Sequence, residues 1–116
     1  MVFCDVLGLK RVNDALGHQA GDDLLIRASK CLRNSFRKND IYRIGGDEFL
    51  IICRDIKEDV FNGRVVELKE KMGSYDVEMS LGPVWKSLSS NLEQMVYEAD
   101  ALMYEDKRAY YASNKK

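Results

Sequence analysis

The stretch Arg43–Phe49 reads Arg-Ile-Gly-Gly-Asp-Glu-Phe and carries the residue types in this chain that are best suited to chemistry. It places two carboxylates, Asp47 and Glu48, directly after the glycine pair Gly45 and Gly46. Strand-like apolar runs flank the stretch, so the glycines predict a two-residue hairpin turn. A tight acidic loop of this kind is typical of a phosphate and metal site, although both acids could instead be solvated turn residues.

A further carboxylate, Asp5, lies inside the apolar run Val2–Leu7, which predicts a strand. A charged side chain is costly to bury without a partner, so this position favours a ligand role. If this first strand pairs antiparallel with the strand after the glycine pair, Asp5 meets Asp47. Two carboxylates beside backbone carbonyls form an oxygen-rich site suited to Mg²⁺ or Mn²⁺. Palm-type nucleotidyl transfer uses such a site.

The spacing of apolar residues predicts the elements that must position these groups. We expect strands over residues 2–7, up to 42, over 49–53 and over 76–81, and helices over 10–16, 21–36, 60–72 and 91–110. This order predicts an α+β fold, a ferredoxin-like or palm-type β-α-β-β-α-β unit with a central antiparallel sheet and an additional C-terminal helix.

Each of the three longer helices has an expected buried face. These faces comprise Leu24, Leu25, Ala28, Leu32 and Phe36 in the first, Val65, Val66, Leu68 and Met72 in the second, and Leu92, Met95, Val96, Ala99, Leu102 and Met103 in the third. The strand over 76–81 alternates apolar and polar residues, which predicts that only one of its faces is buried.

Composition limits the class of protein. With 116 residues, 46% of them hydrophobic, the chain predicts one compact domain over residues 1–116. Its formal net charge of -1 argues against a nucleic-acid partner and against electrostatic contact with a membrane. No apolar run reaches the roughly 18 residues of a membrane helix. Three widely spaced cysteines in apolar runs favour buried free thiols and a cytoplasmic location over disulfides or a zinc site.

Three motifs resemble one known family. Gly45–Phe49 matches the signature of the GGDEF domain family. Asp5–Asp14, followed by Gly17–Asp22, resembles that family's upstream block. Ala99–Tyr104 together with Lys107 is similar to its C-terminal helix motif. The resemblance covers nearly all of the chain, and the family's N-terminal lead-in helix, with the motif before its first strand, is the part without a match.

The resemblance implies a function. GGDEF domains with an intact signature are typically diguanylate cyclases, which join two GTP molecules into cyclic di-GMP and release two pyrophosphates. Each domain binds one GTP, so catalysis requires a second copy of the domain in a transient homodimer. Family members use Mg²⁺ or Mn²⁺, and a sensor or receiver domain outside these residues usually brings the two copies together. The isolated domain is therefore expected to have low activity.

The resemblance also assigns roles to individual residues. The implied metal ligands are Asp5, Asp47 and the carbonyl of Val6, and the implied catalytic residues are Asp47, Glu48 and Asp5. Glu48 matches the acid that assists metal binding or deprotonates the attacking hydroxyl. The implied GTP-binding residues are Asn13 and Asp22 for guanine, and Leu9, Lys10, Gly45, Gly46 and Lys107 around the phosphates. In this assignment, backbone N–H groups of the loop before Lys10 face the β and γ phosphates.

Some of these residues have a simpler interpretation. Asn13 could be a helix-terminal cap, and Asp22 could be an acid in the first turn of the following helix. Lys10 and Lys107 could be ordinary surface charges. His18 is expected to be a structural hydrogen-bonding residue.

The chain departs from the family pattern at three places. Leu7 stands where many members carry a second acid, and Tyr111 stands where the family usually has an arginine that contacts phosphates. Arg37 and Asp40 match the family's product-inhibition motif but lie one residue too close to Gly45, so we expect a loop that caps the preceding helix. Leu7, Tyr111 and the unmatched lead-in helix keep a second hypothesis open, in which the domain binds GTP or cyclic di-GMP and regulates a partner without catalysis.

Overall fold

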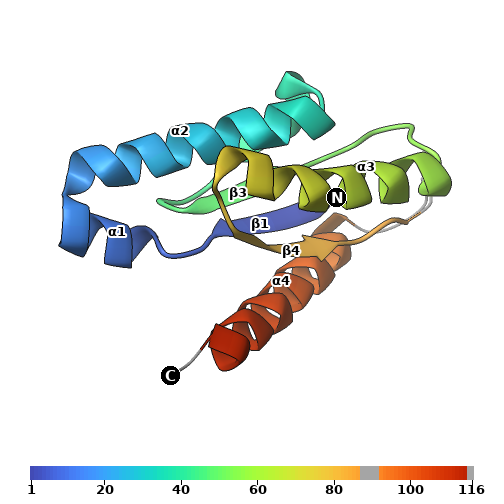
Figure 1. Ribbon diagram of the computed structural model, residues 1–116. Coiled ribbons are helices and arrows are strands. Elements are labelled where there is room, and N and C mark those ends of the chain that lie inside the picture. Colours follow the sequence, from blue (N-terminus) through green and yellow to red (C-terminus); the bar gives the residue numbers. More distant parts are fainter. Residues whose placement is uncertain (87–91, 115–116) are drawn as a thin grey trace.

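The structure is a computed structural model that describes residues 1–86 and 92–114. Its four-stranded antiparallel sheet has the order β2-β3-β1-β4 and carries helices on both faces (Figure 1). The strands are β1 (Val2–Val6), β2 (Ile41–Arg43), β3 (Glu48–Ile51) and β4 (Met79–Pro83), and the helices are α1 (Leu9–Leu16), α2 (His18–Ser35), α3 (Glu58–Met72) and α4 (Leu92–Asn114). The predicted α+β fold with a C-terminal helix is confirmed.

The first face of the sheet packs against α2 and α3. Alternate β1 residues point into this layer, where the side chains of Val2, Cys4 and Val6 are buried. The helices contribute the remaining core, which includes Leu24, Ala28, Leu32, Phe36, Phe61, Val65 and Leu68. The predicted α2 face is therefore correct, with Leu25 at its half-buried margin. Val66 was expected in the α3 face but is 54% exposed, and Phe61 is buried in that helix.

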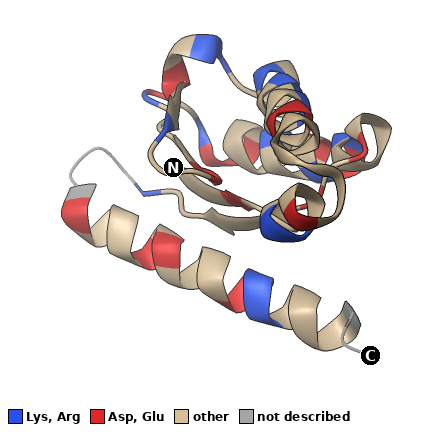
Figure 2. Ribbon diagram, turned by 90° about the vertical axis from the view of Figure 1, so that its left-hand side faces the viewer, with Lys and Arg blue, Asp and Glu red and all other residues tan. Residues whose placement is uncertain are grey.

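The second face of the sheet is covered by α4, which forms a layer of its own (Figure 2). Phe3, Ala99 and Met103 are buried between the sheet and this helix. Gly82 on β4 lies so close to α4 that an added Cβ would stand 1.8 Å from the Ala99 carbonyl oxygen. Leu102 was expected to face inward but is 41% exposed, and Leu92 lies outside the residues whose side chains are described.

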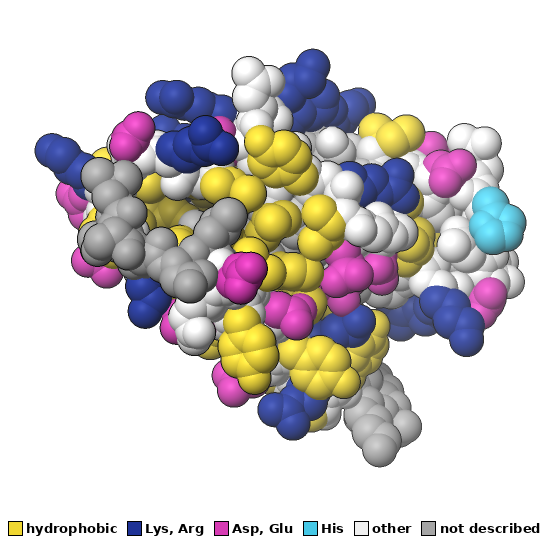
Figure 3. Space-filling view, turned by 180° about the vertical axis from the view of Figure 1, so that it is seen from behind, with side chains coloured by type: hydrophobic (Ala, Val, Ile, Leu, Met, Phe, Trp, Pro, Cys, Tyr) yellow, Lys and Arg dark blue, Asp and Glu magenta, His cyan; other side chains and the backbone are white. Residues whose placement is uncertain are grey.

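Seen from behind, hydrophobic side chains gather in the middle of the surface and charged ones lie around them (Figure 3). The buried residues between the sheet and α4 are bordered by partly buried hydrophobic residues, which are Leu50 in β3, Ile52 just after it, and Met95 and Val96 on α4. The expectation that the strand over 76–81 has one exposed face was wrong. The strand begins at Met79 and is buried on both faces, because α4 covers the second one.

The hairpin between β2 and β3 is longer than predicted. The Ile44 N–H donates to the Glu48 carbonyl over 3.0 Å, so three residues, Gly45 to Asp47, form the turn. A two-residue type I′ turn needs positive φ at both central positions. Within the described ranges, Gly8 and Gly17 are the glycines with positive φ, so Gly45 and Gly46 do not meet this requirement. The two-residue turn predicted for the glycine pair was therefore wrong.

The segment that contains Arg37 and Asp40 also differs from its prediction. It forms a short 3₁₀ turn, η1 (Lys38–Asp40), between α2 and β2. The end of α2 is capped by the Phe36 N–H, which donates to the Leu32 carbonyl over 2.9 Å. The helix cap thus comes from the residue before this segment.

Candidate functional site

Asp5 and Asp47 come together where β1 ends. Asp5 lies opposite Glu48 in the antiparallel pair of β1 and β3. The backbone N–H of the following residue, Val6, donates to the Asp47 carbonyl over 2.8 Å. The Asp5 side chain is only 5% exposed, and its Oδ1 has no hydrogen-bond partner. Burial raises the pKa of the Asp5 carboxyl above its ordinary value, and the neighbouring Asp47 carboxylate adds to this rise. The meeting of the two acids predicted from topology is thus present.

The other oxygen of Asp5 is bound by Lys107 on α4. The Lys107 Nζ lies 2.6 Å from Asp5 Oδ2, and about one third of the lysine side chain is exposed (33%). This hydrogen bond raises the pKa of the Lys107 ammonium and opposes the rise at Asp5. Lys107 was expected to face phosphates, whereas the structure places it on the predicted metal ligand.

Glu48 lies opposite Asp5 in the sheet, and its carboxylate reaches the glycine loop. An added Cβ on Gly45 would stand 2.9 Å from Glu48 Oε1, so the Glu48 carboxylate lies beneath the glycine loop. Across the loop, the Arg43 guanidinium donates from Nε to the Gly45 carbonyl over 3.2 Å and from Nη2 to the Gly46 carbonyl over 2.7 Å. The loop is therefore held between an acid and a base from its own two strands. Sequence reasoning gave Arg43 no role, since only the turn geometry shows which carbonyls it reaches.

A cavity of about 730 Å³ opens beside the paired acids. Its lining residues are Val6, Gly8, Leu9, Lys10, Arg11, Asp14, Ala15, Asp47, Lys107, Tyr110 and Tyr111. The turn from β1 into α1 forms one wall, where Gly8 adopts a left-handed conformation (φ 80°) that glycine tolerates best. The N–H groups at the start of α1 have no acceptor within the helix, so this wall favours anions.

The predicted guanine residues occupy different surroundings. The Asn13 amide lies against α2, where an added Cβ on Gly21 would stand 1.7 Å from Asn13 Oδ1. That oxygen is buried and has no hydrogen-bond partner. The simpler interpretations of both residues fail, because neither α1 nor α2 has a side-chain cap and the first turn of α2 contains no acid. Asn13 therefore has an unsatisfied acceptor beside Gly21, the residue that precedes Asp22.

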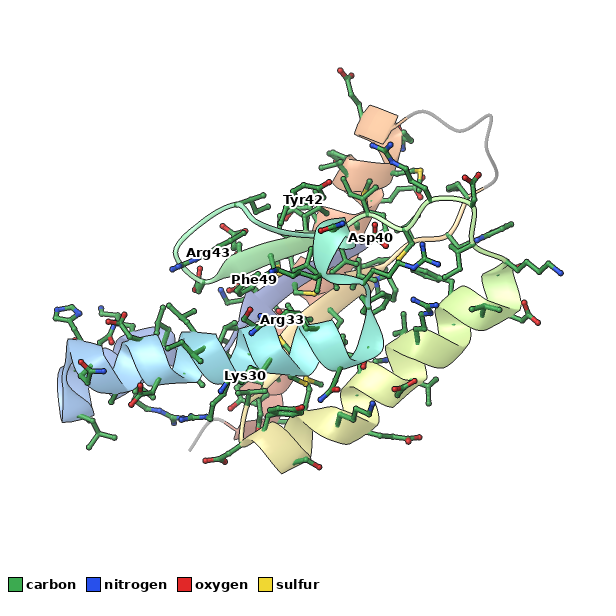
Figure 4. All side chains as sticks on the ribbon, turned by 90° about the horizontal axis from the view of Figure 1, so that it is seen from above. Lys30, Arg33, Asp40, Tyr42, Arg43 and Phe49 are labelled. Atoms are coloured by element: carbon green, nitrogen blue, oxygen red, sulfur yellow. The ribbon has the colours of Figure 1, made fainter. Side chains whose placement is uncertain are left out.

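Asp22 lines a separate groove of about 600 Å³ between α2 and the β2–β3 hairpin. The groove is also lined by Leu25, Ile26, Ser29, Arg33, Lys38, Ile41, Arg43 and Phe49. Figure 4 shows Arg33 on α2 and Arg43 on the hairpin. The sequence gave no signal for this groove, because it depends on how the hairpin docks beside α2.

The acids fit a hard divalent cation better than a soft one. The described part of the chain contains no group of three or more His, Cys, Asp or Glu side chains arranged around a common metal position. Asp5, Asp47 and the Val6 backbone do lie together, and the unpartnered Asp5 Oδ1 is an anionic oxygen without a donor. An Mg²⁺ or Mn²⁺ ion usually takes one or two carboxylates and completes its shell with water and phosphate, which agrees with this donor set.

A family model described as the GGDEF domain of diguanylate cyclases matches residues 1–112. The chain belongs to the GGDEF domain family. Among its relatives, the diguanylate cyclase DgcS of Shewanella oneidensis is 31% identical over 113 residues, which are 92% of this chain and 38% of that protein. The uncharacterised protein YtrP of Bacillus subtilis is 32% identical over 114 residues, 93% of this chain and 20% of its own length. The chain thus spans well under half of these relatives.

Solved GGDEF domains have the same architecture. The GGDEF domain of DgcB from Caulobacter crescentus, solved with cyclic di-GMP, superposes with a TM-score of 0.81 at 21% identity, over 93% of this chain and 71% of that one. The GGDEF domain of YfiN from Pseudomonas aeruginosa has a TM-score of 0.72 at 26% identity, over 93% and 74%. In the described ranges of this GGDEF domain, no helix is both long and apolar enough to cross a membrane.

Proposed function

We propose that this GGDEF domain is a diguanylate cyclase that condenses two GTP molecules into cyclic di-GMP with release of pyrophosphate. The observation that carries the proposal is the meeting of Asp5 and Asp47 beside a cavity that is also lined by Lys10 and Lys107. A buried acid and a half-buried one beside a cation-lined cavity suit a nucleotide whose triphosphate arrives with its own divalent cation.

Each residue has a proposed part in this reaction. Asp5, Asp47 and the Val6 carbonyl would hold Mg²⁺ or Mn²⁺, which neutralises charge on the transferring phosphate when it is bound. Glu48, whose carboxylate lies beneath Gly45, is the candidate acceptor for the proton of the attacking 3′-hydroxyl. Asn13 and Asp22 would accept hydrogen bonds from the guanine edge. The chain contributes mainly by positioning and by electrostatics.

The proposal includes partners. One domain would hold one GTP, so a second copy must present the other nucleotide, and we propose a transient homodimer. Residues 1–116 act as one GGDEF domain in this scheme, controlled by a sensor or receiver domain elsewhere. The free thiols Cys4, Cys31 and Cys53 agree with a cytoplasmic location, where GTP is made.

The test uses the purified chain with GTP and Mg²⁺ or Mn²⁺ at rising protein concentration. We expect cyclic di-GMP, identified by mass spectrometry, at a rate that increases more than linearly with protein concentration. Asp47→Ala should abolish the product, while Asp59→Ala, on the exposed start of α3, should not change it. Absence of product in the unmodified protein at high concentration would overturn the proposal.

A second candidate function is a regulatory module that binds GTP or cyclic di-GMP without catalysis. The observation that favours it is the pairing of Lys107 with Asp5, which places a cation where a metal is expected. Isothermal titration separates the two functions. A regulatory module binds GTP but forms no cyclic di-GMP. A cyclase forms cyclic di-GMP, which requires the divalent cation to compete successfully with the Lys107 ammonium for the Asp5 carboxylate.

A further inference from the structure

Arg11 projects from the first turn of α1 over the turn that joins β1 to α1. Helical side chains lean toward the N-terminus of their helix, and the Arg11 guanidinium follows this rule, since an added Cβ on Gly8 would lie 3.5 Å from its Nη2. Arg11 lines the cavity that contains Asp47, Lys10 and Lys107. Its charge therefore stands beside the unpaired N–H groups at the start of α1.

No hydrogen bond or ion pair to the Arg11 side chain is found within residues 1–86 and 92–114, and the side chain is exposed. The charge of Arg11 opposes the rise in the pKa of the Tyr110 hydroxyl, which is caused first by burial and then by the hydrogen bond with Glu78. Asp14 and Asp47 are the acids that line the same cavity. A guanidinium that holds no structural partner costs little to redirect toward a ligand.

The opposite wall of the cavity lacks such a cation. Tyr111 lines it from α4, and the nearby Arg108 guanidinium lies 5.9 Å from the centre of the Tyr104 ring instead. Lys107, the remaining cation of α4 in this cavity, is bound to Asp5. The free positive charge of the cavity consequently comes from α1, where Lys10 and Arg11 are adjacent.

We propose that Arg11 binds the β and γ phosphates of the nucleoside triphosphate and supplies from α1 the cation that Tyr111 does not supply from α4. This inference rests on the proposed nucleotide site and goes beyond it by naming a further binding residue. A guanidinium can donate two parallel hydrogen bonds to one phosphate, which a lysine cannot do. Arg11 thus discriminates between nucleotides by the length of the phosphate chain.

The test measures the affinities of GTP, GDP and GMP by isothermal titration with Mg²⁺ at protein concentrations where turnover is negligible. Arg11→Ala should weaken GTP binding by about 10-fold and leave GMP binding within about 2-fold, because only the terminal phosphates lose a charge-assisted hydrogen bond. Arg11→Lys should retain part of the affinity. Adding Tyr111→Arg to the Arg11→Ala variant should restore GTP binding, because it places a guanidinium on the opposite wall.

Arg108→Ala is the matched control, since it removes an exposed arginine that does not line the cavity. Circular dichroism verifies that every variant is folded. Equal affinities of Arg11→Ala and Arg108→Ala for GTP would overturn the inference, as would an equal loss for GTP and GMP or an unmodified protein that binds no GTP. Arginine-dependent GTP binding without cyclic di-GMP would instead support the inference and overturn the cyclase function alone.

Discussion

Lys107 Nζ lies 2.6 Å from Asp5 Oδ2, although 102 positions separate the two residues in the chain. The contact joins the first strand to the last helix and neutralises a carboxylate that the sheet has buried. It also connects the stability of the fold to the candidate metal site, because the same carboxylate is the proposed ligand. Several consequences of this architecture can be measured.

Lys107→Met should lower the free energy of unfolding at pH 7 by about 1–3 kcal/mol, because it leaves the buried Asp5 carboxylate without its cation. Asp5 raises the pKa of Lys107, so the stabilisation is complete below the ordinary lysine pKa and is lost as pH rises through the raised value. The stability difference between variant and unmodified protein should therefore shrink above roughly pH 10.5. Urea unfolding at neutral and alkaline pH measures this difference.

The control is Lys86→Met, which removes a more exposed ion pair whose Nζ to Glu98 Oε2 distance is 3.5 Å. Such a surface pair contributes about 0–1 kcal/mol, so this variant should stay close to the unmodified protein. Equal effects of the two substitutions would contradict a special role for the Lys107 pair.

Gly82→Ala should separate α4 from the sheet, because the new methyl group would stand 1.8 Å from the Ala99 carbonyl. We expect a loss of about 1–3 kcal/mol in unfolding free energy and a larger proportional loss of cyclic di-GMP synthesis, since α4 carries Lys107. Chemical denaturation and product assays check the two effects. Gly63→Ala is the control, because Gly63 is on the exposed side of α3 and a methyl group there would meet no atom within 4 Å beyond its own helix turn. Alanine should stabilise the helix by about 0.5–1 kcal/mol.

Gly21→Ala should displace the Asn13 amide, which occupies the space that the methyl group needs. If Asn13 reads guanine, the variant should lose most of its preference for GTP over ATP while its helix α2 remains formed. Competitive binding of the two nucleotides measures the preference, and circular dichroism measures the helix content. Unchanged discrimination in the Gly21→Ala protein would remove Asn13 from the guanine site.

Arg43→Gln should loosen the signature loop, because it removes the donors to the Gly45 and Gly46 carbonyls. We expect faster amide hydrogen exchange at residues 44–48 and roughly 10-fold slower product formation, with less than about 1 kcal/mol lost in stability, since Arg43 is exposed. Arg33→Gln tests whether lost charge alone explains the effect, because Arg33 lines the same groove from α2. Identical exchange rates in the two variants would show that the loop does not depend on Arg43.

Local patterns were sufficient for some features of the fold. The apolar run of β1, the helical stripe of α2 and the order of elements together required Asp5 and Asp47 to meet, because antiparallel pairing fixes which strand ends are neighbours. The signature residues also identified the family before any contact was visible.

Features that depend on docking could not be predicted from spacing. An apolar period shows that a helix has a buried side but not how wide that side is, which explains the exposure of Val66 and Leu102. Similarly, the alternating pattern around β4 could not reveal that α4 lies directly against Gly82 and covers the face of the strand that was expected to be exposed. The pairing of Lys107 with Asp5 required the same docking.

The contact between β1 and α4 has a consequence for the order in which a ribosome delivers the chain. Among the elements that the structure describes, β1 leaves the exit tunnel before the others, with Asp5 and Phe3 among its side chains, and α4 follows them all. Until α4 has emerged, the second face of the sheet lacks Ala99 and Met103, and the Asp5 carboxylate lacks its ammonium partner. A nascent chain arrested before Lys107 therefore keeps an open sheet and an uncompensated acid, so the site is complete only after α4 has been translated.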